Sequence, residues 1–135
     1  LHAFKTQEKV IENITTTVGR AVLARRLSGN TVYTGIVNYC ALGSSNTAPA
    51  IGQTTLGTET YRKALSSGTY SSNIAYLENF FTAEEVNGTV EEYGFFIDVS
   101  ASADSGQMFN RFIQSITKSV TETLNVQSQV TINDA

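Results

Sequence analysis

Two pairs of adjacent glutamates are the places in this chain where acidic side chains cluster. Glu84-Glu85 and Glu91-Glu92 flank Asn87-Gly88, a dipeptide typical of tight turns. A hairpin here would bring four carboxyl groups together, and glycoside hydrolysis needs two carboxylates in a cleft with unlike environments. A loop tip is solvated and offers neither condition, so the pattern favours an exposed edge. Weak calcium binding with Asp98 and Asp104 is the lesser alternative, without a regular calcium-loop spacing.

Other reactive residue types are scarce. The chain has one histidine, His2, one cysteine, Cys40, and no tryptophan. It has no GxSxG or glycine-rich nucleotide motif, and Cys40 lies in an apolar segment (VNYCAL) that predicts a small buried residue. We therefore predict a protein that is not an enzyme, with no catalytic residues, no cofactor and no metal site.

Composition and charge narrow the class further. Hydrophobic residues make up 41% of the 135 residues and charged residues 16%, which excludes a disordered tail, and no apolar run is long enough to insert in a membrane. Serine and threonine account for 31 residues, which favours strands and turns. Residues 1–30 carry a net charge of +3 and residues 31–135 a net charge of −6, so the two parts should attract each other, within one subunit or between neighbours. This balance predicts no nucleic-acid partner.

One stretch, Ile11 to Leu27, has the periodicity of an amphipathic helix. Its apolar residues recur at spacings of three and four: Ile11, Ile14, Val18, Val22 and Leu23. Thr15 to Thr17 can cap its start, and Gly29-Asn30 can end it. We predict an N-terminal arm and helix, residues 1–30, that either covers one end of the chain's own core or docks on another subunit.

Residues 31–135 have the alternation of strands and should form one β domain. The expected strands, separated by turns and polar loops, are Thr31–Leu42, Glu59–Leu65, Ser72–Thr82, Thr89–Val99, Gln107–Ile113 and Lys118–Ile132. The expected turns include Ser66-Ser67-Gly68 and Asn87-Gly88, and the latter should join its two neighbouring strands in a central hairpin. The predicted fold class is mainly β, an antiparallel two-sheet β-sandwich with one N-terminal amphipathic helix.

Basic residues in acidic, β-rich surroundings are candidates for subunit contacts. Arg62, Lys63 and Arg111 could pair with Glu59, Glu92 or Asp98 inside the fold or reach across a subunit boundary. The interface candidates are Ile14, Val18, Val22, Arg25, Arg26, Arg62, Lys63 and Arg111. A different class, a carbohydrate-binding module, would need several tyrosines on one exposed face, drawn from Tyr33, Tyr39, Tyr61, Tyr70, Tyr76 and Tyr93.

Six short motifs occur in an order that resembles a known family. They are Tyr39-x-Ala41-Leu42-Gly43, Thr47-Ala48-Pro49, Thr55-Leu56-Gly57-x-Glu59-x-x-Arg62-Lys63, Asn87-Gly88-Thr89-Val90-x-Glu92-x-Gly94-x-Phe96, Gly106-x-Met108-Phe109-x-Arg111 and Ile116-Thr117-Lys118-Ser119. Together they resemble tailed-bacteriophage virion structural proteins of the tail-fibre, collar or decoration type.

The resemblance implies a structural role in a virus particle that is assembled in the host cytoplasm. Expected partners are other copies of the chain, with a trimer as the leading guess by analogy to fibres, and other virion proteins. A host-surface glycan is a further candidate ligand, in line with the carbohydrate-binding alternative.

Overall fold

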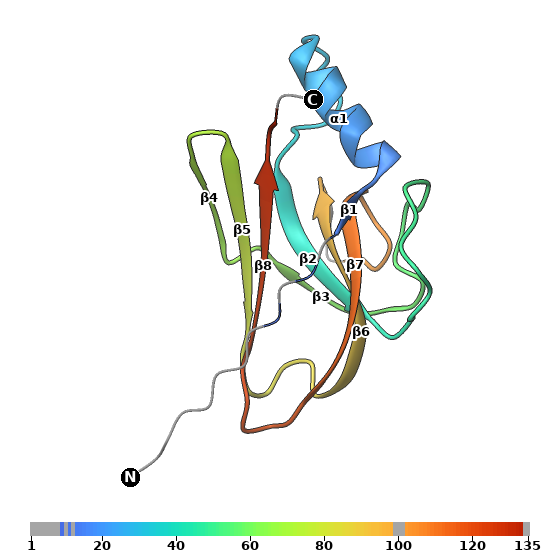
Figure 1. Cartoon of the computed structure of the whole chain (residues 1–135), viewed down its shortest axis with the longest axis vertical. Helices are drawn as coiled ribbons and strands as arrows, with labels where there is room; N and C mark the ends of the chain where they lie inside the picture. Colours follow the sequence, from blue (N-terminus) through green and yellow to red (C-terminus); the bar gives the residue numbers. More distant parts are fainter. Residues whose placement is uncertain (1–8, 10, 12, 99–101, 134–135) are drawn as a thin grey trace.

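Two antiparallel β-sheets and one short helix form the part of the chain that the computed structural model describes, residues 9, 11, 13–98 and 102–133 (Figure 1). This is the sandwich with an N-terminal helix that the sequence predicts. The elements are β1 (Ile14–Thr15), α1 (Thr17–Leu27), β2 (Val37–Gly43), β3 (Glu59–Ala64), β4 (Ser67–Ser71), β5 (Ile74–Phe81), β6 (Gly88–Ile97), β7 (Gln107–Lys118) and β8 (Leu124–Thr131).

The larger sheet has the strand order β1-β7-β6-β2-β3, and the smaller sheet has the order β4-β5-β8. The predicted hairpin of β5 and β6 is therefore wrong, because β5 pairs with β4 and β8, whereas β6 pairs with β2 and β7. The turn between them carries positive φ at Val86 and Gly88 and leads the chain from one sheet to the other. Asn87-Gly88 marks a reversal of the chain, but it does not specify which strands become partners.

The main core lies between the two sheets. Its buried members come from both sheets and are Cys40, Leu42, Phe81, Val90, Tyr93, Phe95, Phe112 and Val126. A second buried cluster, Ala41, Leu56, Phe96 and Met108, lies on the other side of the larger sheet, where the β2–β3 connection supplies Leu56. The central strands are thus buried on both faces, which explains why Phe95, Phe96 and Ile97 are all apolar.

Helix α1 starts later than its periodicity predicts. Residues Ile14 and Thr15 pair with β7, opposite Arg111 and Asn110, so the predicted start at Ile11 is wrong. Pairing with β7 satisfies the hydrogen-bonding groups of this backbone, so the segment is a strand although its apolar spacing also fits a helix. The helix begins after Thr16, whose hydroxyl accepts a hydrogen bond from the Gly19 amide at 2.9 Å, as the predicted threonine cap requires.

The predicted turn at Ser66-Ser67-Gly68 is also wrong, because Ser67 to Ser71 form strand β4. The reversal lies at Ser72-Asn73, where Ser72 has φ 55°. Serine and glycine are common in turns, so this strand has no sequence signature of its own. Two further boundaries differ: β2 begins at Val37 instead of Thr31, and Lys118 ends β7 instead of starting the last strand.

Candidate interaction surface

The long connection between β2 and β3, residues 44–58, is held by a buried ion pair. Glu92 on β6 and Arg111 on β7 are 0% and 1% exposed, and two guanidinium nitrogens, Nε and Nη2, lie 3.1 and 3.0 Å from Glu92 Oε1. The same carboxylate accepts hydrogen bonds from the backbone amides of Ser45, Gly57 and Thr58 at 3.0, 2.7 and 2.8 Å. One buried carboxylate therefore holds both ends of this connection.

Arg111 holds the middle of the same connection. Its Nη1 donates to the carbonyl oxygen of Thr47 at 2.8 Å and to the side chain of Gln53 at 3.3 Å.

The glycines near the two ends of this connection, Gly43 and Gly57, are fixed by close packing. A Cβ on Gly43 would lie 2.3 Å from the Thr58 carbonyl oxygen, and one on Gly57 would lie 2.5 Å from the side chain of Ser45. The motif residues Gly43 and Gly57 therefore have a packing role.

A second buried pair joins β3 to the connection between β6 and β7. Arg62 Nε lies 2.6 Å from Glu59 Oε2, and both side chains are almost completely buried. Arg62 Nη1 also donates to the hydroxyl of Ser105 at 3.0 Å, and the Asp104 amide donates to Glu59 Oε1 at 3.2 Å. Arg62 thus bonds to an acid of its own strand and to a loop distant in sequence.

A third, partly exposed pair ties the two sheets together. Lys63 Nζ lies 2.8 Å from Glu85 Oε1 and donates to the carbonyl oxygen of Phe80 at 2.7 Å, and the Tyr61 hydroxyl donates to Glu85 Oε2 at 2.6 Å. The hydrogen bond from Lys63, followed by those from Tyr61 and the Thr82 amide, lowers the pKa of the Glu85 carboxyl to about 2. Arg62, Lys63 and Arg111, three predicted interface residues, all make ion pairs within the chain.

The acidic pairs flanking Asn87-Gly88 do not share one site. Glu85 pairs with Lys63, Glu92 is buried against Arg111, and Glu91 accepts a hydrogen bond from Ser115 at 3.1 Å. Glu84 and Glu85 lie in the connection between β5 and β6, whereas Glu91 and Glu92 lie on β6, and Glu85 and Glu92 are bound by different cations.

Other chemistry-bearing groups are placed as follows. Cys40 is fully buried, and burial raises the pKa of its thiol far above the ordinary value. Asp98 accepts hydrogen bonds from the backbone amide and hydroxyl of Thr34, which fixes the segment before β2. Within the described part of the chain, no group of three or more histidine, cysteine or acidic side chains could hold a metal ion. Among the described helices, none is long and apolar enough to cross a membrane.

Helix α1 packs on the sandwich with one face and leaves its basic residues exposed. Val22 is buried against Ile97 and Phe109, and Ile14 and Val18 are half-buried. The helix thus covers one end of the chain's own core, one of the two predicted alternatives. Arg25 and Arg26 are exposed in the last turn, where the helix dipole favours cations. In the described residues no ion pair includes them, and Arg25 lies over the ring of Tyr33.

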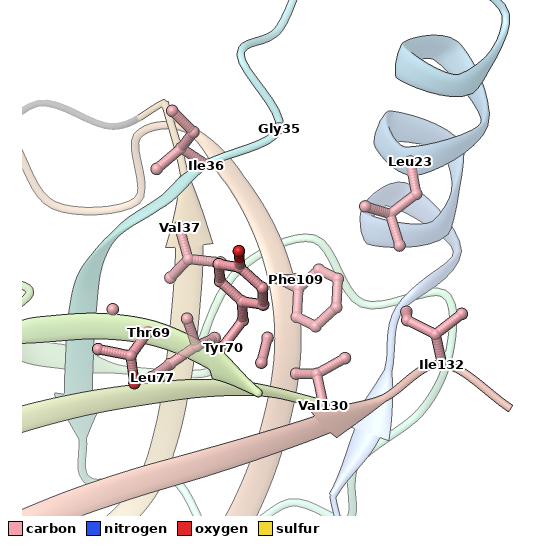
Figure 2. A pocket seen from close by; sticks show the side chains of 12 residues that line it. Leu23, Gly35, Ile36, Val37, Thr69, Tyr70, Leu77, Phe109, Val130 and Ile132 are labelled. Atoms are coloured by element: carbon pink, nitrogen blue, oxygen red, sulfur yellow. The ribbon is translucent and has the colours of Figure 1, made fainter. Parts of the chain in front are cut away.

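An open apolar groove, with a volume of about 340 Å³, lies between the smaller sheet, the start of β2 and α1 (Figure 2). Its lining is mostly apolar and comes from α1, the α1–β2 connection, β2, β4, β5, β7, β8 and the residue after β8; it includes Leu23, Val37, Leu77, Phe109, Val130 and Ile132. At its edge Ile36, Tyr70 and Ile132 are 66%, 82% and 63% exposed. We call these three residues the groove rim.

The groove rim is absent from the interface residues predicted from sequence. Its members come from the α1–β2 connection, β4 and the residue after β8, so no local pattern joins them. Leu27 and Val32, in the helix end and the same α1–β2 connection, are also exposed. A contiguous exposed apolar patch is typical of interaction surfaces, whereas single exposed apolar side chains are common on any protein.

Comparison with known proteins adds no family to this description. The chain matches no protein-family model, and no curated protein sequence is significantly similar to it.

Proposed function

We propose that this protein is a non-enzymatic structural component of a tailed bacteriophage virion and acts through contacts between subunits. The observation that carries the subunit contacts is the groove rim, where three large apolar side chains lie exposed around an apolar groove. Covering them removes apolar surface from water, which favours association. The phage origin itself is supported by the order of the sequence motifs.

Rigidity without disulfides supports the same role. The buried ion pairs Glu92–Arg111 and Glu59–Arg62 hold the two connections that flank the larger sheet, and Cys40 is a free, buried thiol. Loops held by buried contacts open less readily than free ones, which suits a particle that persists outside the cell. These contacts are made by residues of the sequence motifs, namely Gly57, Glu59, Arg62, Glu92 and Arg111. The motifs that carry the resemblance are therefore also the residues that fix the two connections.

The carbohydrate-binding alternative has less support. Tyr93 is buried in a stacked pair with Phe112, with ring centroids 4.8 Å apart, and Tyr61 is bonded to Glu85. Of the six tyrosines, Tyr70 alone has an exposed side chain. A sugar-stacking platform usually presents several aromatic rings on one face, and the six tyrosines do not form one.

Antibodies against the purified protein would test the proposal. They should label particles released from cells that carry the natural gene, at regular positions visible by electron microscopy, and the protein should co-sediment with those particles. A protein that stays in the soluble fraction, with no labelled particle, would refute the virion role. Saturable binding to a glycan array, with no particle labelled, would favour the carbohydrate-binding alternative.

A further inference from the structure

Strand β4 is an edge strand without the usual protection against pairing. Among the described strands it pairs with β5 alone, and all five of its residues, Ser67 to Ser71, are exposed. From Leu65 to Asn73 the sequence contains no charged residue and no proline. Soluble proteins commonly place lysine, proline or a bulge on such edges, because an unpaired edge is a template for another strand.

The same strand borders the open groove. Tyr70 pairs with Ala75 and Gly68 pairs with Leu77, and both partners line the groove, so strand alternation places Tyr70 and Gly68 on the groove side of the sheet. Figure 2 shows the Tyr70 ring at the groove. Tyr70 is nevertheless 82% exposed. At β8, the other edge of this sheet, Val126 and Ser128 on the same side are buried. The inward-facing side of this sheet is therefore uncovered at β4.

We propose that a second copy of this chain pairs its own β4 with β4 in an antiparallel arrangement, around a two-fold axis at Thr69. This deepens the proposed function and rests on its central idea, that the protein works through contacts between copies. Two-fold pairing is the commonest symmetry of homo-oligomers. The result is one continuous sheet, with the strand order β8-β5-β4 followed by β4-β5-β8 of the second copy.

Register and charge make β4 complementary to itself. With Thr69 opposite Thr69 of the second copy, Tyr70 stands opposite Gly68 on the groove side, and the tyrosine ring covers a position that has no side chain of its own. Aromatic rings over cross-strand glycines are a known stabilising arrangement in sheets. Because the segment carries no charge, self-pairing brings no like charges together.

Cysteine cross-linking tests this register. In an antiparallel pair the Cα atoms of opposite residues lie about 4.5–5.5 Å apart, within the range that a disulfide spans. Thr69→Cys should form a covalent dimer on mild oxidation. Gln129→Cys is the matched control, because Gln129 is exposed on β8, the other edge of the sheet, and both residues pair with Tyr76. Cys40 is buried and does not compete.

The oligomeric state gives the second measurement. Light scattering on the wild-type protein should give an even number of the 14.6 kDa chains, in the simplest case two. Thr69→Lys places like charges opposite each other and should reduce the mass by half with an unchanged circular dichroism spectrum. Gln129→Lys should keep the wild-type mass.

Three results would overturn the two-fold contact: a monomeric wild-type protein, the trimer that the fibre analogy predicts, or a covalent dimer of Gln129→Cys without one of Thr69→Cys. If the protein is found in virus particles but Thr69→Cys does not cross-link, this contact fails and the virion role stands. If Thr69→Cys cross-links but the protein is missing from particles, the virion role fails and the contact stands.

Discussion

A buried arginine beside a buried glutamate destabilises a fold unless the polar atoms around both side chains have partners. Glu92 meets this condition through the amides of residues 45, 57 and 58. Arg111 meets it at Nε and Nη1, whereas its buried Nη2 has the ion contact with Glu92 and no hydrogen bond. The pair therefore acts mainly as a clamp on that connection. The side chains of the connection, Leu56 excepted, contribute little to the core.

Breaking the clamp should strongly destabilise the protein. Arg111→Met leaves Glu92 buried without its cation, and we expect a loss of about 3–5 kcal/mol in the free energy of unfolding, measured by urea denaturation. Arg20→Met is the matched control, because Arg20 is exposed on α1 and should cost less than about 0.5 kcal/mol.

A double variant, Glu92→Leu with Arg111→Met, tests whether the hydrogen bonds from Glu92 to the loop amides contribute stability beyond the ion pair. Replacing both members of a buried pair by apolar residues is often harmless. Here we expect no recovery, because the amides of Ser45, Gly57 and Thr58 lose their acceptor. Recovery to wild-type stability would show that the amide contacts contribute nothing.

The pair of Lys63 and Glu85 should make stability depend on pH. The pKa of Glu85 is about 2 in the folded protein, below its ordinary value of 4.5, so its contribution is present above pH 4.5 and is lost as the pH falls towards 2. Glu85→Gln should remove about 1 kcal/mol at neutral pH, the size typical of partly exposed pairs, and progressively less as the pH falls towards 2. Urea denaturation across this range measures the difference. Glu84→Gln, the exposed neighbour, should follow the wild-type curve.

At the scale of elements, α1 lies so close to β7 that only glycine fits at the contact. A Cβ on Gly19 would lie 2.8 Å from the backbone oxygen of Phe109 and 2.9 Å from its Cα. Alanine normally stabilises a helix by about 1 kcal/mol relative to glycine. We expect the opposite sign here: Gly19→Ala should lower the free energy of unfolding by about 1–3 kcal/mol, because the helix must move away from the sheet.

Thermal or urea denaturation of Gly19→Ala measures this effect. The control is Gly52→Ala, because a Cβ on Gly52 would meet no other described part of the chain within 4 Å and the residue has no positive φ. The stability of this control should stay within about 0.5 kcal/mol of wild type. A stabilised Gly19→Ala would mean that the helix packs less tightly on β7 than the structure shows.

Elements with alternating or apolar sequences were predictable, and those specified by distant partners were not. Alternation identified β5 and β6, and the order of Thr16 and Gly29 around a helical pattern located the core of α1. The sequence of β4 contains serine and glycine, whose turn preference is overridden by pairing with β5. The acidic partners of Arg62 and Arg111 were among the predicted alternatives, but proximity of Glu92 to Arg111 depends on the pairing of β6 with β7. The groove rim could not be predicted, because its three residues are far apart in sequence.

At the scale of the whole molecule, the groove lies beside β4, the edge strand of the smaller sheet. An apolar dye whose fluorescence rises in apolar surroundings should therefore report the two-fold contact. A groove of about 340 Å³ is large enough for such a small molecule. Thr69→Lys, as a monomer with an open groove mouth, should give a higher signal than the wild-type dimer, and Gln129→Lys should match wild type. Equal signals from all three proteins would show that association leaves the groove open.

The hydrogen bonds between Glu92 and main-chain amides have a practical consequence. Every amino acid except proline supplies an amide hydrogen, so most side chains at the tip of the 44–58 connection are free to change while Ser45, Gly57 and Thr58 keep their bonds. Foreign peptide epitopes grafted between Thr47 and Gln53 would keep these anchors, the Arg111 contacts and Leu56, on a scaffold that already fixes where the graft begins and ends.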